Sequence, residues 1–239
     1  MKPILGVVLL PVLFLAACTP KETPTASEPV KTLSGTVVEG QFVAQGDKVT
    51  LQTSAWTGGA GHVTLNILDA ASKTLELDRT VLGADGQFSF ASLPTPETSD
   101  LRKITAEGEG CTNTFVVSDP AALNATAALF ALAKTNVRFD LVAYDKTGTS
   151  AATTKTGTLI YADRAVTVQG SQTCTIEGKT FVADFNLALL KGWNMTTTTL
   201  NVSTRAVTVR NGSPAGAQWI SIKTTQGTTG LALNGFILR

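Results

Sequence analysis

The chain has 239 residues, 19 basic and 18 acidic side chains, and only 15% charged residues. This length accommodates one large or two ordinary domains, and the near-neutral charge gives no electrostatic basis for binding nucleic acid or an anionic surface. The charged fraction lies well below the usual ~25%. Threonine, alanine, glycine and valine take its place, a bias that favours strands and tight turns over charged surface helices.

Residues 1–17 have the composition of a secretory signal peptide. Lys2 supplies a positive charge, and the apolar run that follows it is too short for a membrane-spanning helix. The tetrapeptide Leu15-Ala16-Ala17-Cys18 is similar to the lipobox of bacterial lipoproteins. This resemblance implies diacylglycerol on the Cys18 thiol, cleavage after Ala17, and acylation of the new amino terminus by a fatty acid such as palmitate. It also implies an extracytoplasmic location, anchored to the cell membrane or outer membrane. The alternative is an ordinary signal peptide with a chance cysteine.

Residues 18–32, the lipidated cysteine and the segment after it, are expected to form a flexible tether. The segment reads TPKETPTASEPVKT, with mixed charges and Val30 as its one bulky apolar residue. Such a sequence cannot bury enough surface to offset the entropy lost on ordering. As a coil it would span about 20 Å, enough to hold a domain clear of lipid headgroups.

From Leu33 onward apolar and polar residues alternate, as they do in half-buried strands. Residues 62–67 are an example, in which Val63, Leu65 and Ile67 alternate with polar side chains. We therefore expect a β-sandwich domain over residues 33–118. Its polar alternate positions should face water.

Asp85-Gly86 predicts a tight turn, because glycine tolerates positive φ. The strand after it should bury Phe88 and Phe90 on one face and expose the residues between them. Residues 85–94 resemble the D-G-x-F-x-F-x-x-L-P segment of transthyretin-like and carboxypeptidase-regulatory-like β-sandwiches. That resemblance implies a non-catalytic spacer or binding platform.

The second half repeats the strand pattern. Asp119-Pro120 is expected to begin a short helical turn that leads into a strand, since aspartate suits a helix cap and proline the first helical position. Alternation then returns in segments such as 137–144 and 181–187, and Asn211-Gly212 marks a turn. Many short strands at regular spacing indicate a sandwich or barrel. We therefore expect an all-β chain with a second β-rich domain over 125–239, giving two β-sandwich-like domains.

Lipidation of Cys18 would leave Cys111 and Cys174 as an even pair in a compartment where disulfides persist. Two outcomes remain open, a Cys111–Cys174 disulfide or two separately buried thiols. We expect the disulfide, which would join the two domains.

The sequence offers few residues for catalysis. His62 is the single histidine and no C-x-x-C occurs, so a His-rich or mixed His/Cys metal centre is excluded, and no nucleotide-binding or nucleophile-elbow motif is present. We expect His62 at the surface, and neither a metal nor a cofactor. Glu107 and Glu109 would project from one face of a strand about 7 Å apart, a separation found in glycosidases. Their flanking glycines favour an exposed strand end instead.

Among the three tryptophans, Trp219 is the candidate binding residue. Alternation places it on the face opposite Ile220 and Ile222, and an exposed tryptophan on a sheet often marks a contact surface. The other reading, which we expect, is that Trp219 packs under a neighbouring loop or against the other domain. The sequence thus predicts a membrane-anchored envelope lipoprotein with a non-catalytic binding or structural role and an envelope protein or glycan as partner. The alternative hypothesis is a carboxylate-dependent hydrolase of the envelope, which would act for example on glycans.

Overall fold

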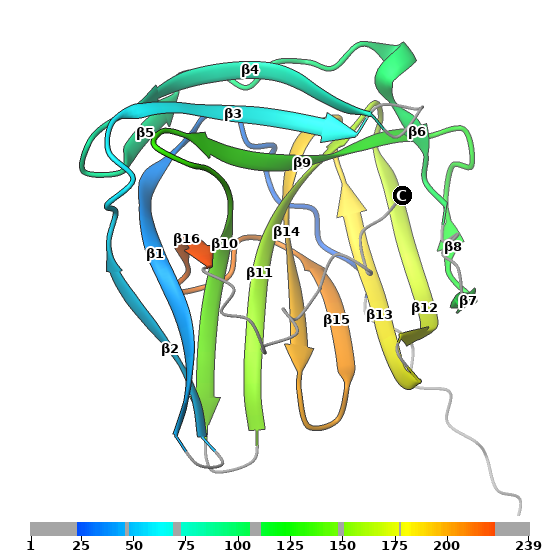
Figure 1. Cartoon of the computed structure of the whole chain (residues 1–239). Helices are drawn as coiled ribbons and strands as arrows, with labels where there is room; N and C mark the ends of the chain where they lie inside the picture. Colours follow the sequence, from blue (N-terminus) through cyan, green and yellow to red (C-terminus); the bar gives the residue numbers. More distant parts are fainter. Residues whose placement is uncertain are drawn as a thin grey trace, which may run out of the picture.

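The computed structural model describes residues 23–45, 48–68, 73–105, 111–147, 151–176 and 178–222. Within these ranges the regular structure consists of sixteen strands and one 3-10 turn, η1 (Thr98–Asp100), without an α-helix. The all-β prediction is confirmed. Figure 1 shows β3, β4 and β9 lying across one end of the molecule, over the long strands β1, β10 and β11.

The strands, in chain order, are β1 (Leu33–Gln45), β2 (Lys48–Ala55), β3 (Gly61–Leu68), β4 (Thr74–Leu82), β5 (Gln87–Phe90), β6 (Arg102–Lys103), β7 (Cys111–Asn113), β8 (Val116–Val117), β9 (Leu123–Leu132), β10 (Asn136–Thr147), β11 (Ala151–Ala162), β12 (Val166–Ile176), β13 (Lys179–Leu189), β14 (Gly192–Asn201), β15 (Ala206–Asn211) and β16 (Gln218–Ile222).

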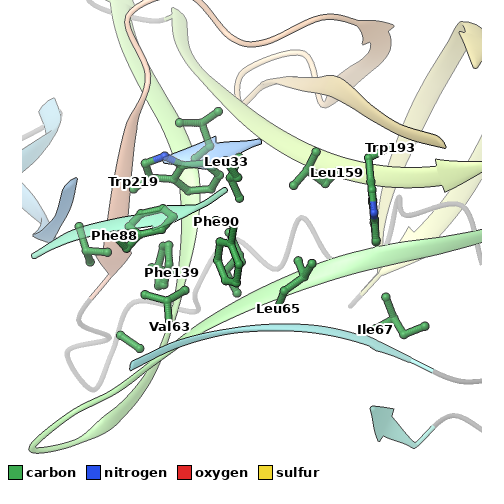
Figure 2. Close-up of a cluster of buried hydrophobic side chains, with 14 of the residues drawn as sticks. Leu33, Val63, Leu65, Ile67, Phe88, Phe90, Phe139, Leu159, Trp193 and Trp219 are labelled. Atoms are coloured by element: carbon green, nitrogen blue, oxygen red, sulfur yellow. The ribbon is translucent and has the colours of Figure 1, made fainter. Parts of the chain in front are cut away.

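Seven strands close a ring of hydrogen-bonded ladders. Around the ring, β9 pairs with β3, β3 with β4, β4 with β5, β5 with β1, β1 with β16, β16 with β10, and β10 with β9. The ring closes because β1 and β10 each pair with two ring strands along their length. β1 pairs first with β5 and then with β16, and β10 pairs first with β9 and then with β16. Because side chains alternate across each strand, one set points into the ring and forms the first core. Figure 2 shows Val63, Phe88, Phe139 and Trp219 meeting there.

The sheet extends from the ring through β11, β14, β15, β13 and β12. The short strands β7 and β8 cover the outer edge of β12. One face of this extension carries a second core, whose fully buried members include Val168, Phe185 and Leu187.

The hydrogen bonds and the first core cross the expected boundary between 33–118 and 125–239. β1 pairs with β16, β3 with β9, and β7 with β12. Phe88 of the earlier segment contacts Phe139 and Trp219 of the later one, with ring centroids 5.5 and 5.8 Å away. The expected division is therefore revised: the two segments share one hydrogen-bonded network, because β9, β10 and β16 complete the ring that β1, β3, β4 and β5 begin.

The turn at Asp85-Gly86 is confirmed, with Gly86 at φ +86°. The Gly86 amide donates to the Gly83 carbonyl at 2.9 Å, and Asp85 Oδ1 accepts from the Gln87 amide at 3.1 Å. In the strand that follows, Phe88 and Phe90 are buried and the alternate residues are exposed, as the pattern predicts.

The Asp119-Pro120 segment forms a single turn rather than the expected helical one. The Ala122 amide donates to the Asp119 carbonyl at 3.0 Å, and the Ala121 amide to Asp119 Oδ1 at 2.9 Å. β9 begins at Leu123, directly after this turn. The local bonds to aspartate compete successfully with helix formation at this position.

β3 departs from the expected half-buried pattern. Val63, Leu65 and Ile67 are buried as expected, but Thr64 and Asn66 on the other face are only 2% and 6% exposed. The Asn66 side-chain amide donates to Thr64 Oγ1 at 2.8 Å, so the buried polar pair partly satisfies itself. The prediction of a wet face is wrong here.

The end of the expected tether lies against the folded body. The Val30 amide donates to the Trp193 carbonyl at 2.7 Å, and the Leu93 amide to the Lys31 carbonyl at 2.8 Å. The Val30 side chain is partly buried against the first core. The expectation of a flexible segment up to residue 32 is revised, because these bonds and this burial offset the ordering entropy that composition alone could not.

Candidate functional site

The two cysteines of the candidate disulfide lie on neighbouring strands. Cys111 of β7 and Cys174 of β12 are direct register partners, with Cα atoms 4.1 Å apart and a sulfur–sulfur bond of 2.06 Å. Cys174 is 1% exposed, within the second core. The disulfide prediction is confirmed, and the alternative of two separate thiols is wrong. The bond ties the three-residue strand β7 to the long strand β12.

Trp219 is a core residue. Its side chain is 9% exposed, and its ring lies 5.8 Å from those of Phe88 and Phe139 (Figure 2). Its indole N–H donates to the Ser34 carbonyl at 3.3 Å. The close approach depends on Gly35, where a Cβ would overlap Trp219 Cδ1. The expected packing of Trp219 is confirmed and the alternative of a contact surface is wrong, because β16 lies between β1 and β10 and this face of β16 points into the ring.

The other two tryptophans are also buried, Trp56 at 7% and Trp193 at 3% exposure. Their indole groups donate to backbone carbonyls, Trp56 to Gly59 at 2.8 Å and Trp193 to Pro94 at 2.7 Å. All three indoles therefore have structural partners. None of the three indoles is therefore exposed for stacking on a glycan.

His62 lies exposed on β3, as predicted. Glu107 and Glu109 lie outside the described residues, so the carboxylate pair stays a prediction. Cys18 lies outside them as well. Across the part of the chain that the structure describes, no group of three or more histidine, cysteine, aspartate or glutamate residues could hold a metal ion.

His62→Ala is expected to change the free energy of unfolding by no more than about 0.5 kcal/mol, because an exposed side chain away from special backbone contributes little. Leu65→Ala on the same strand is the matched comparison, and should cost about 2–5 kcal/mol because Leu65 is fully buried. Urea unfolding of both variants checks this. A loss at His62 comparable to that at Leu65 would show that the histidine has a structural role.

Asp163 and Asp119 share one arginine, Arg164. Arg164 donates to Asp163 Oδ2 at 2.9 Å and to Asp119 Oδ2 at 3.3 Å, and the Leu123 amide donates to Asp163 Oδ1 at 2.8 Å. Burial raises the pKa of the Asp163 carboxyl, but the bonds from Arg164 and Leu123 outweigh it and hold the pKa below its ordinary value. These contacts fix the turn that leads into β9, which is a structural role.

Arg102 of β6 was not identified from the sequence. Its Nε and Nη2 atoms are buried, and no residue in the described ranges accepts a hydrogen bond from either. An arginine in the short segment between η1 and the glycine-rich residues 106–110 carries no motif. Only the tertiary structure distinguishes it from a solvated surface arginine.

The described residues include no helix with the length and hydropathy needed to cross a membrane. Comparison of the chain with protein-family models, with curated proteins and with solved structures found no match.

Proposed function

We propose that the protein is a lipid-anchored lipoprotein of the bacterial envelope with a non-catalytic binding or structural role. The observation that carries this proposal is the Cys111–Cys174 disulfide. Structural disulfides persist mainly in extracytoplasmic compartments, which is where the signal-like residues 1–17 and the lipobox-like tetrapeptide that ends at Cys18 would direct the chain. Two independent features thus agree on the compartment.

The docked segment around Val30 bears on how such an anchor would hold the body. A side chain at Gly212 would meet Ser27, and one at Gly192 would meet Pro29, so the segment follows the surface before β1 begins. Lipid on Cys18 would then be joined to the body through residues 19–26. Eight residues reach at most about 29 Å even when fully extended, against about 50 Å for the fourteen residues expected from the sequence. The body would be held close to the membrane.

The non-catalytic role is supported by how the polar groups are used. Arg164 pairs with Asp163 and Asp119, and Arg210 donates to Asp184. Glu39, 8% exposed, accepts from the Thr57 amide at 3.1 Å. These acids have structural partners.

The non-catalytic role is tested by incubating the full protein with purified envelope glycans and measuring new reducing ends: none is expected. Release that is lost in Glu107→Gln or Glu109→Gln would instead support the hydrolase.

Cys18→Ser should abolish incorporation of labelled palmitate and release the protein from the membrane fraction, because the thiol is the acceptor of the diacylglycerol group in the lipobox-like motif. The double variant Cys111→Ala/Cys174→Ala is the matched control and should keep its label. Metabolic labelling followed by fractionation measures both. Label that persists in Cys18→Ser, or wild-type protein without label, would contradict the anchor.

A further inference from the structure

The chain separates its charges between two regions of the fold. Residues 74–100, which include β4 and β5, contain five acidic residues and one basic residue. Residues 174–210, which include β13, β14 and β15, contain four basic and two acidic residues. Figure 1 shows β4 and β5 at one end of the molecule and the turn between β14 and β15 at the opposite end. The near-neutral charge of the whole chain conceals this separation.

The turn between β14 and β15 lies beside the start of β13. β13 and β15 are parallel neighbours, and the Val182 amide donates to the Arg205 carbonyl at 3.4 Å. We call residues 179–182 and 202–205 together the extension tip. All of these residues except Phe181 are exposed.

The extension tip combines apolar and basic side chains at the surface. Val182 is 47% exposed and Val202 is 40% exposed. Lys179 and Arg205 are exposed as well, and neither has a carboxylate partner among the described residues. Exposed apolar side chains flanked by basic ones are typical of surfaces that bind at a membrane interface.

Arg205 holds a backbone conformation that arginine rarely adopts. Its φ is +55°, in the left-handed region that favours glycine and asparagine, and the other described residues with positive φ are glycines. Asn201 fixes the turn, because its Oδ1 accepts hydrogen bonds from the Ser203 and Thr204 amides, each at 3.1 Å. An arginine here costs the turn stability, which favours a role for its side chain in binding.

The segment before β1 runs toward the extension tip when it is traced back to Cys18. Val30 is bonded at the start of β14, whereas Ser27 lies next to Gly212. The Gly212 amide donates to the Met195 carbonyl, which is further along β14 in the direction of the tip. The chain from Ser27 to Cys18 reaches at most about 32 Å, and the strand from Met195 to the turn covers about 23 Å. A lipid on Cys18 can therefore lie level with the tip.

We propose that the extension tip docks on the membrane that carries the lipid anchor, with an anionic phospholipid bilayer as its partner. This inference rests on the proposed anchor and adds the surface that meets the membrane. Val182 and Val202 enter the boundary between headgroups and acyl chains, and Lys179 and Arg205 contact lipid phosphate. Because the anchor already holds the body at the bilayer, a small surface is sufficient. The acidic end with β4 and β5 then faces away from the anionic lipid.

The test uses the lipidated full chain in vesicles of phosphatidylethanolamine and phosphatidylglycerol. A fluorophore is attached to Thr180→Cys in the tip or, as the matched control, to Val81→Cys on β4, which is 69% exposed. Cys111 and Cys174 form the disulfide and Cys18 carries the lipid, so only the introduced thiol reacts. Lipids with brominated chains should quench the fluorophore in Thr180→Cys and not in Val81→Cys. Equal quenching at both positions, or stronger quenching at Val81→Cys, would overturn the proposal.

Arg205→Gly, made in the labelled Thr180→Cys protein, tests the charge. It should lower the ratio of docked to undocked body about five-fold, the factor that one basic residue contributes near an anionic surface. Its melting temperature should not fall, because glycine suits φ +55°. Arg79→Ala, which removes an exposed arginine paired with Glu76 on β4, should leave the quenching unchanged. In vesicles of phosphatidylcholine alone the effect of Arg205→Gly should vanish, and a loss that persists there would contradict the assignment to anionic lipid.

Flotation with the vesicles separates this proposal from the anchor itself. Protein that carries no lipid and does not float would overturn the proposed anchor, and the docking with it. Protein that floats while the fluorophore in Thr180→Cys is not quenched would overturn the docking alone. Self-quenching between fluorophores in place of quenching by lipid would show that a second copy of the chain covers the tip, which also overturns the bilayer as its partner.

Discussion

Replacing Trp219 by alanine is expected to lower the free energy of unfolding by about 3–5 kcal/mol. The indole lies inside the ring of strands, in contact with Phe88 and Phe139, and is 9% exposed. Its removal therefore leaves a cavity that the surrounding strands cannot close. The Ser34 carbonyl also loses its donor. Trp219→Phe keeps most of the apolar contact and should lose less.

Val81→Ala is the matched control for this experiment. Val81 is 69% exposed on β4, and its truncation should stay within about 0.5 kcal/mol. Urea denaturation followed by circular dichroism measures all three variants. If Trp219 instead served as an exposed contact residue, Trp219→Ala would unfold at the same urea concentration as the wild type, and the placement of β16 inside the ring would be contradicted.

Loss of the Cys111–Cys174 disulfide should have an effect of similar size. The bond closes a loop across a sequence separation of 63 residues. In the loop-entropy account, a cross-link over such a span contributes about 4 kcal/mol by restricting the unfolded chain. For a protein of this size, that corresponds to a fall in melting temperature of about 8–16 °C.

The disulfide experiment compares Cys111→Ala/Cys174→Ala with the wild type, both with and without a reducing agent. Reduction should lower the melting temperature of the wild type to that of the double variant and leave the variant unchanged. A single transition is expected in each case, because β11 of the extension pairs with β10 and β9 of the ring. A change of less than about 1 kcal/mol would show that the reduced chain keeps the loop closed by other contacts.

Local features of the fold could be predicted from the sequence. The turn at Gly86 and the inward faces of Phe88 and Phe90 depend on residues within a few positions of each other, so backbone preference and alternation suffice. The disulfide followed from the count of cysteines and the compartment, without any knowledge of which strands meet.

The position of Trp219 could not be predicted in this way. Alternation tells which residues share a face of β16, but not which face lies inside. That choice depends on β1 and β10, whose pairing with β16 joins parts of the chain that are far apart in sequence. The small residue Gly35, which leaves room for the indole, also comes from the distant strand β1.

Composition misled the prediction in the segment around Val30. Its prolines and charges are typical of a tether, yet Val30 and Lys31 bond to Trp193 and Leu93. The backbone groups that hold this segment belong to strand ends and loops that the fold brings together. The sequence of the segment alone therefore does not indicate them. Arg102 illustrates the same limit, since the burial of its guanidinium edge arises only from tertiary structure.

The central claim, a lipid-anchored extracytoplasmic protein, is tested most directly by the intact mass of the protein isolated from its native membranes. The account predicts a polypeptide that begins at Cys18, carries a diacylglyceryl group and an amide-linked fatty acid, and takes up an alkylating agent only after reduction, at Cys111 and Cys174. A polypeptide that begins at another residue, or one whose Cys18 thiol is alkylated without reduction, would contradict it.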